Sequence, residues 1–132
     1  MITAQTASGD AARLCGLSNG NELPVTALVC LCTCPDAEIA NRIADALVSE
    51  RLAACVNIVP GVRSVYRWQG RVEHVDEMQL LIKTVRERCD ALVARIVELH
   101  PYELPEVIAV EVAGGLAAYL GWIDEQTHVE SD

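Results

Sequence analysis

The stretch of residues 53–84 constrains the fold of this 132-residue chain most strongly, because apolar and polar side chains alternate along most of its length. Apolar residues hold mainly even-numbered positions on both sides of Trp68, Gln69 and Gly70, with charged or amide side chains between them. A period of two is typical of a β-strand with one buried face. The sequence therefore predicts a hairpin of two long strands whose turn lies at these three residues.

The positions of the apolar residues also predict the type of turn. Because the apolar residues are even-numbered on both arms, we expect even positions to pair with even positions. A two-residue loop of Gln69 and Gly70 would pair even with odd positions, whereas a three-residue loop that includes Trp68 keeps the match. We therefore predict the three-residue loop, with Gly70 in the left-handed conformation of a bulged turn.

The predicted hairpin is longer than the body of the protein. Its first arm, residues 53–68, would span roughly 50 Å at about 3.3 Å per residue, whereas a domain of about 110 residues has a diameter of roughly 35 Å. We expect Pro60 and Gly61 to kink this arm and to absorb part of the excess. The rest would expose unpaired strand edges, which proteins cover or blunt. Another copy of the chain would cover them, so we predict an obligate homo-oligomer built on the hairpin.

The charge balance disfavours two classes of partner. The chain carries 10 basic and 19 acidic residues, a net charge of −9, whereas nucleic-acid and anionic membrane surfaces attract basic patches. No apolar run is long enough to span a bilayer, and no basic segment precedes an apolar run at the N-terminus. We therefore expect no membrane span and no signal peptide. In that setting the six cysteines are expected to be reduced thiols of a cytosolic protein.

The order of the elements predicts the fold class. Residues 1–24 show no sustained period and are expected to form a flexible tail before a domain of residues 25–132. Outside the hairpin we expect strands at 24–34 and 106–112, and helices at 35–52, 84–100 and 116–127. The order β-α-β-β-α-β with an extra C-terminal helix is that of an α+β, ferredoxin-like fold, a four-stranded antiparallel sheet with two helices on one face. The other face must meet solvent or a partner, and the apolar hairpin favours a partner.

Two helix starts carry recognisable caps. The first helix begins either with Cys34 as the cap and Pro35 in the first helical position, or with Asp36 as the cap. At the second helix, Thr84 and Glu87 match a capping box in which the glutamate reaches back to the cap.

Three cysteines at a spacing of two share one face of the first strand. Cys30, Cys32 and Cys34 should have Cα atoms about 6.6 Å apart, whereas two thiolates on one zinc ion need their sulfurs within roughly 4 Å. A regular strand therefore does not offer a ready-made chelate. We interpret Cys30 as a core residue, and we keep Cys32 and Cys34 as candidates because they lie closer to the strand end where such folds expose sites.

His100, at a helix end before Pro101, either caps the last carbonyls of that helix or acts as a metal ligand or proton carrier. Trp68, Lys83, Tyr102 and Glu103 are candidates to line a ligand cleft, although each aromatic residue taken singly is better explained by packing. Lys83 is the only lysine of the chain. No nucleophile with a base and an orienting group is recognisable, so we expect no enzyme.

Five motifs together resemble the CutA family of divalent-cation tolerance proteins. They are CTCPD, LAACVNIVPGVRSVYRWQGRVE, LLIKT, HPYELPE and YLGW, and the resemblance covers about residues 25–123. It implies a ferredoxin-like fold similar to that of PII signalling proteins, a homotrimer, a cytoplasmic location, and a link to copper and other divalent metals.

The resemblance also implies a metal site. In the family's copper-binding description, a cysteine on the first strand and two adjacent histidines before Pro-Tyr are ligands. The cysteine falls on Cys32 and the second histidine on His100, whereas the first histidine position is Leu99 here. Cys34, water or a neighbouring subunit would have to complete this pair. Thiolate with imidazole suits Cu(I) or zinc.

Three hypotheses about function follow from these observations. The first is a trimeric metal-binding or metal-tolerance protein with Cys32 and His100 as ligands. The second is a PII-like sensor that binds a small anionic ligand between subunits, in a cleft lined by Lys83, Tyr102 and Glu103. The third is an assembly or anchoring protein whose main product is the trimer itself.

Overall fold

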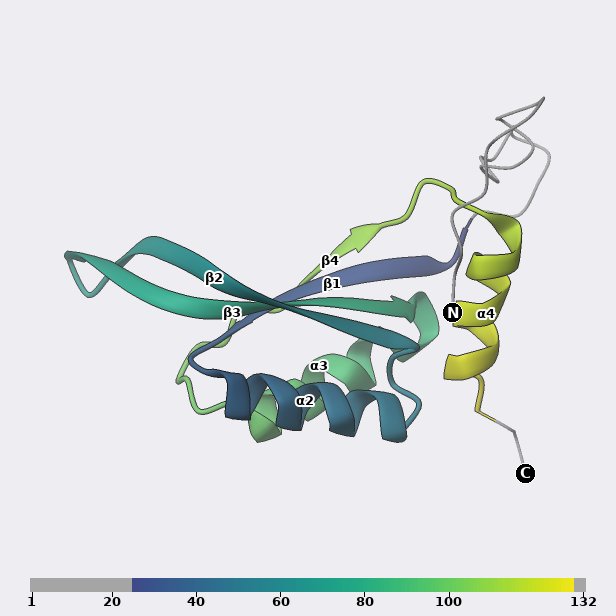
Figure 1. The fold of residues 1–132 in the computed structure, drawn as a ribbon, viewed down its shortest axis with the longest axis horizontal. Coiled ribbons are helices and arrows are strands. Elements are labelled where there is room, and N and C mark those ends of the chain that lie inside the picture. Colours follow the sequence, from purple (N-terminus) through teal and green to yellow (C-terminus); the bar gives the residue numbers. More distant parts are fainter. Residues whose placement is uncertain (1–24, 130–132) are drawn as a thin grey trace.

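The computed structural model describes residues 25–129, so the expected tail of residues 1–24 lies outside the described part of the chain. A four-stranded antiparallel sheet has the order β2-β3-β1-β4, and α2 and α3 lie together against one of its faces (Figure 1). This arrangement confirms the α+β, ferredoxin-like prediction. The elements are β1 (Ala27–Cys34), α2 (Ala37–Ser49), β2 (Cys55–Trp68), β3 (Arg71–Val85), the 3₁₀ turn η1 (Arg86–Arg88), α3 (Cys89–Leu99), β4 (Ile108–Glu111) and α4 (Ala117–Thr127). Among the helices of the described residues, none has the length and apolar character needed to cross a bilayer.

Asp36 sets the start of α2. Its backbone is extended, and its Oδ1 accepts a hydrogen bond from the Ile39 N–H at 2.9 Å. Of the two predicted caps, Asp36 is therefore the one that the structure uses. The bond satisfies one of the amide groups that a helix start leaves without a partner.

The capping box predicted at Thr84 and Glu87 is wrong. Thr84 lies inside β3, fully buried, and its Oγ1 donates a hydrogen bond to the Leu52 carbonyl at 2.7 Å. The residue before η1 is Val85, which makes no side-chain capping bond. A buried hydroxyl needs a partner, and here the partner is the segment that leads from α2 into β2. Thr84 therefore ties that segment to the sheet.

The predicted three-residue turn is also wrong, and the cause lies earlier in β2. Trp68 pairs with Arg71, so Gln69 and Gly70 form a two-residue turn, with φ angles of 50° and 81°. Both residues are left-handed, as a type I′ hairpin turn requires. The prediction for Gly70 is confirmed, but its place in a bulged three-residue loop is not.

A bulge in β2 explains this difference in register. Before the bulge Val56 pairs with Ile82, even with even, whereas after it Val62 pairs with Glu77, even with odd. The register shifts between Val59 and Val62, where Gly61 has φ of 78°. The predicted irregularity at Pro60 and Gly61 is confirmed, and it moves the pairing by one residue. The outer half of the hairpin projects beyond the helices (Figure 1).

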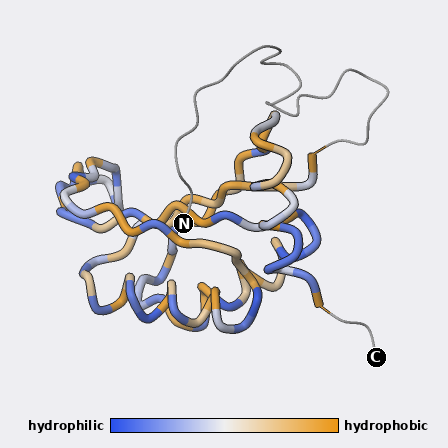
Figure 2. Tube along the Cα trace, turned by 45° about the vertical axis from the view of Figure 1, so that its right-hand side comes forward, coloured by the Kyte–Doolittle hydropathy of each residue, from blue (hydrophilic) through white to orange (hydrophobic). Residues whose placement is uncertain are grey.

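The core fills the space between the sheet and the two helices. The buried residues of β1 and β3 that pack with α2 and α3 in this core are even-numbered, and their helical partners recur at helical spacing. Along the helix at the bottom of Figure 2 hydrophobic and hydrophilic residues alternate accordingly. Burial of this apolar surface supplies most of the driving force for folding. The fully buried aliphatic side chains of this core are Ile43, Leu47, Leu80, Ile82, Leu92 and Ile96.

The opposite face of the sheet is covered at one end by α4. Ile123 of α4 packs with Ala27, Ala54 and Val85, at the end of the sheet away from the hairpin tip (Figure 1). The remaining apolar positions of this face are here called the open face. They are Val29, Leu31, Leu81, Ile108 and Val110, as the strand pairing places them. Ile108 and Val110 are 52% and 50% exposed.

Candidate functional site

The three cysteines of β1 all point into the core. Cys30, Cys32 and Cys34 are fully buried among the side chains that join the sheet to α2 and α3. The interpretation of Cys30 as a core residue agrees with this placement. Burial, with Cys89 nearby, raises the pKa of the Cys30 thiol to about 12.

The structure brings Cys32 and Cys34 together with His100. One ligand atom from each of these three buried residues lies within 4.8 Å of the other two. Two thiolates at about 2.3 Å from a single ion are at most about 4.6 Å apart. The donor atoms lie closer than the Cα spacing of about 6.6 Å expected along the strand, within a bound of 4.8 Å that slightly exceeds this limit.

His100 reaches β1 from the end of α3. Its Nε2 lies 2.7 Å from the Thr33 carbonyl oxygen, and its Nδ1 lies 3.2 Å from the Tyr102 backbone nitrogen. A carbonyl only accepts and a backbone N–H only donates, so the proton is on Nε2 and the lone pair is on Nδ1. The ring therefore bonds to β1, whereas one of the two predicted alternatives was a cap on the carbonyls of α3.

This tautomer is the one that a metal-binding histidine commonly uses. The N–H of such a histidine donates to a carbonyl or carboxylate, which fixes the ring and leaves the other nitrogen for the metal. In His100 the bond to Thr33 is short, and the bond that Nδ1 accepts from Tyr102 is longer.

The two thiols of the cluster differ in acidity. A hydrogen bond with Cys34, together with burial, raises the pKa of Cys32 far above its ordinary value. The same hydrogen bond lowers the pKa of Cys34, against the opposing effect of burial. The Sγ of Cys32 also donates a hydrogen bond to the Thr33 carbonyl at 3.7 Å.

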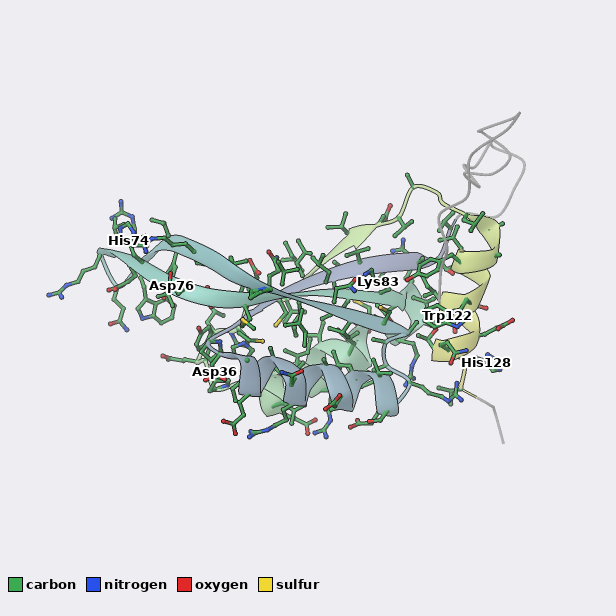
Figure 3. The ribbon with its side chains drawn as sticks, viewed as in Figure 1. Asp36, His74, Asp76, Lys83, Trp122 and His128 are labelled. Atoms are coloured by element: carbon green, nitrogen blue, oxygen red, sulfur yellow. The ribbon has the colours of Figure 1, made fainter. Side chains whose placement is uncertain are left out.

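Three of the four residues predicted for a ligand cleft lie together. Trp68, Tyr102 and Glu103 line a pocket of about 640 Å³ between the outer half of the hairpin and the loop after α3. Lys83 lies elsewhere, between Val29 and Cys55 in the sheet, at the α4 end (Figure 3). The other residues of the pocket are Thr33, Ser64, Val65, Tyr66, Arg67, Glu77, Leu104 and Glu106.

Tyr102 connects this pocket with the cysteine and histidine cluster. Its hydroxyl donates to Glu77 Oε2 at 2.8 Å, and its ring centroid lies 4.5 Å from that of His100. Burial and the Glu77 bond raise the pKa of Tyr102 above its ordinary value. Glu77 is only 7% exposed, and the sequence alone does not single it out, since no spacing relates it to Tyr102. Its only sequence signal is an acidic residue in a strand pattern.

Comparison with known proteins places the chain in a family. The family model of the CutA1 divalent ion tolerance protein matches residues 28–126. The divalent-cation tolerance protein CutA of Thermus thermophilus is 52% identical over 99 residues, which are 75% of this chain and 96% of that protein. The human protein CutA is 39% identical over 115 residues, which are 87% of this chain and 64% of that protein.

Solved structures agree with this assignment. The divalent cation tolerance protein Cut A1 of Thermus thermophilus superposes with a TM-score of 0.76 at 50% identity, over 77% of this chain and 99% of that one. CutA1 of Oryza sativa superposes with a TM-score of 0.77 at 43% identity, over 81% and 98% of the two chains. The resemblance inferred from the sequence motifs is confirmed. The chain belongs to the CutA1 divalent ion tolerance protein family.

Proposed function

We propose that this chain is a cytoplasmic, homotrimeric metal-binding protein of the CutA type, without enzymatic activity, that binds copper or a related divalent metal. Cys32 and His100 are its proposed ligands. The observation that carries this proposal is the convergence of buried sulfur and imidazole donors, all within 4.8 Å, at one end of β1. A bound copper ion would be held away from solvent there, which suits a tolerance function.

The donors fit such an ion in their chemistry. Thiolate and imidazole are the ligands preferred by copper and zinc, whereas magnesium and calcium prefer oxygen. Thr33 holds the His100 ring so that the lone pair is on Nδ1.

The open face supports the homotrimer. Ile108 and Val110 expose about half of their surface beside Leu31 and Val29 in the sheet. Contiguous exposed apolar surface of this kind marks interaction sites. The hairpin also carries exposed apolar side chains beyond the bulge, with Val65 and Val72 at 58% and 57% exposure. In the proposed trimer, a second and a third copy of the chain cover these exposed apolar surfaces.

Metal titration of the reduced protein tests the proposed ligands. We expect Cys32→Ala and His100→Ala each to weaken Cu(I) binding by at least about 100-fold, because losing an outer-shell partner already costs roughly 10- to 100-fold. The measurement is competition against a Cu(I) chelator, with the mass of the protein determined in the same buffer.

Cys30→Ala is the matched control for this titration. It removes an equally buried thiol from the same face of the same strand, but one outside the cluster. Its affinity should equal that of the unmodified protein. Unchanged affinity in both Cys32→Ala and His100→Ala would show that the ligands are wrongly assigned.

A second candidate function is a PII-like sensor, favoured by the pocket at Trp68 and Tyr102. Three glutamates and one arginine line this pocket, and Lys83 does not. These charges favour a cationic ligand over the anionic one predicted from Lys83. The faces of Tyr66, Trp68 and Tyr102 would add cation–π attraction.

A thermal-shift comparison tests this second candidate. We expect tetramethylammonium or choline to raise the unfolding midpoint, because ligand at 100 times its Kd adds about 2.7 kcal/mol of stability. Acetate and phosphate should not, and Trp68→Ala should abolish the shift. A shift with phosphate alone would exclude a cation pocket. A trimer that responds to neither metal nor cation would leave the assembly or anchoring function.

A further inference from the structure

A third donor belongs to the cluster besides the two proposed ligands. Cys34 lies two residues after Cys32 on the same face of β1, and its sulfur is within 4.8 Å of the donors of both Cys32 and His100. All three residues are buried. Their ligand atoms form a compact group, whereas Cys30, equally buried on that face, lies outside it.

We infer that Cys34 is the third ligand of this site. The two thiolates of Cys32 and Cys34 and the imidazole of His100 then make the site selective for Cu(I). This inference rests on the proposed metal-binding function and names the ion which that function serves. Soft sulfur ligands select Cu(I) over harder divalent ions. Neither Mg²⁺ nor Ca²⁺ would find the oxygen ligands that it requires.

The number of donors separates Cu(I) from zinc. Zinc in structural sites is almost always four-coordinate, whereas this cluster supplies three donors. A fourth ligand would have to come from a water molecule or a neighbouring subunit, and each of the three donor residues is buried within its own chain. Cu(I) takes low coordination numbers, so three buried donors complete its shell without water.

The electrostatic setting also favours a cation. Glu77, which is only 7% exposed, accepts a hydrogen bond from Tyr102, whose ring lies against that of His100. Two buried thiolates close to this carboxylate would accumulate negative charge in a region of low dielectric. A bound cation offsets that charge. The protons of the two thiols leave to solvent when the metal binds, as metal binding by cysteine requires.

A spectroscopic titration tests the inference. The protein is used in reduced form with Cys15, Cys55 and Cys89 replaced by serine, so that thiolate signals come only from β1. Cd²⁺ serves as the optical probe, because thiolate-to-metal charge transfer scales with the number of bound thiolates. Cu(I) and Zn²⁺ affinities are measured by chelator competition in the same background.

The expected results distinguish Cys34 from its neighbours. Cys34→Ala should lose about half of the charge-transfer absorbance and at least about tenfold in Cu(I) affinity. Cys30→Ala should change neither. The parent protein should bind Zn²⁺ at least about 100-fold more weakly than Cu(I). Should Cys34→Ala fail to fold, Cys34→Ser keeps the size of the side chain and replaces sulfur by a harder donor.

Two outcomes would overturn the inference, and they differ in what they say of the proposed function. If Cys34→Ala and Cys34→Ser keep full absorbance and affinity while Cys32→Ala loses both, Cys34 is not a ligand and the proposed function stands. If Cys32→Ala also keeps both, the metal site itself is wrong. Equal affinities for Zn²⁺ and Cu(I) would overturn the selectivity.

Discussion

The double substitution Ile108→Asp and Val110→Asp is expected to convert the proposed trimer into monomers. Both side chains are half exposed on the open face, and the register places them beside Leu31 and Val29. An interface on this face would bury two carboxylates without partners, and removing an unpaired charge from water costs several kcal/mol. The mass in solution, measured by sedimentation equilibrium, reports the result.

Val97→Asp is the matched control for this experiment. Val97 is 56% exposed, comparable with Ile108 and Val110, but it lies on α3 on the other side of the sheet. This variant should keep the mass of the unmodified protein. If the double variant also keeps it, the open face is not the interface, and the outer half of the hairpin becomes the surface to test.

Truncation of Leu80 to alanine is expected to have the largest effect on stability. Leu80 is fully buried in β3, in the core between the sheet and the two helices. Removing a buried leucine side chain to alanine costs about 2–5 kcal/mol, through lost transfer free energy and the cavity left behind. The denaturant midpoint should fall accordingly, at a fixed protein concentration because an oligomer is stabilised by mass action.

Leu104→Ala controls for the loss of a leucine as such. Leu104 is 71% exposed in the loop after α3, and surface substitutions of this kind usually stay within about 0.5 kcal/mol. A similar fall in both variants would mean that Leu80 does not sit in a close-packed core. No change in either would place the stability of the protein in the assembly between subunits.

The sequence by itself determined the order and type of the elements. The period of two in residues 53–84 and the helical spacing around Ile43 and Ile96 are local properties, so they specify strands and helices before any packing is known. For the start of α2 the sequence left two candidate caps, Cys34 and Asp36, and the structure uses Asp36. Motif resemblance then identified the family, which the comparisons confirmed.

The register of the hairpin is known only from the structure, although the bulge that sets it lies within β2 itself. The rule that even-numbered positions pair with even-numbered positions holds only where neither strand contains a bulge. The bulge near Gly61 shifts the outer pairing by one residue and makes the turn a two-residue turn. Thr84 shows the same limit, because its hydroxyl finds a buried carbonyl 32 residues away instead of a helix start.

The candidate site depended on the tertiary structure most of all. Cys32 and His100 were identified by resemblance, but only the packing of α3 against β1 brings His100 to Thr33, 67 residues earlier in the chain. The same packing joins Cys34 to the cluster and Tyr102 to Glu77, and it leaves Lys83 at the other end of the sheet. Periodicity fixes which face a side chain occupies. Distances between side chains far apart in sequence depend on how whole elements pack, and no local pattern encodes them.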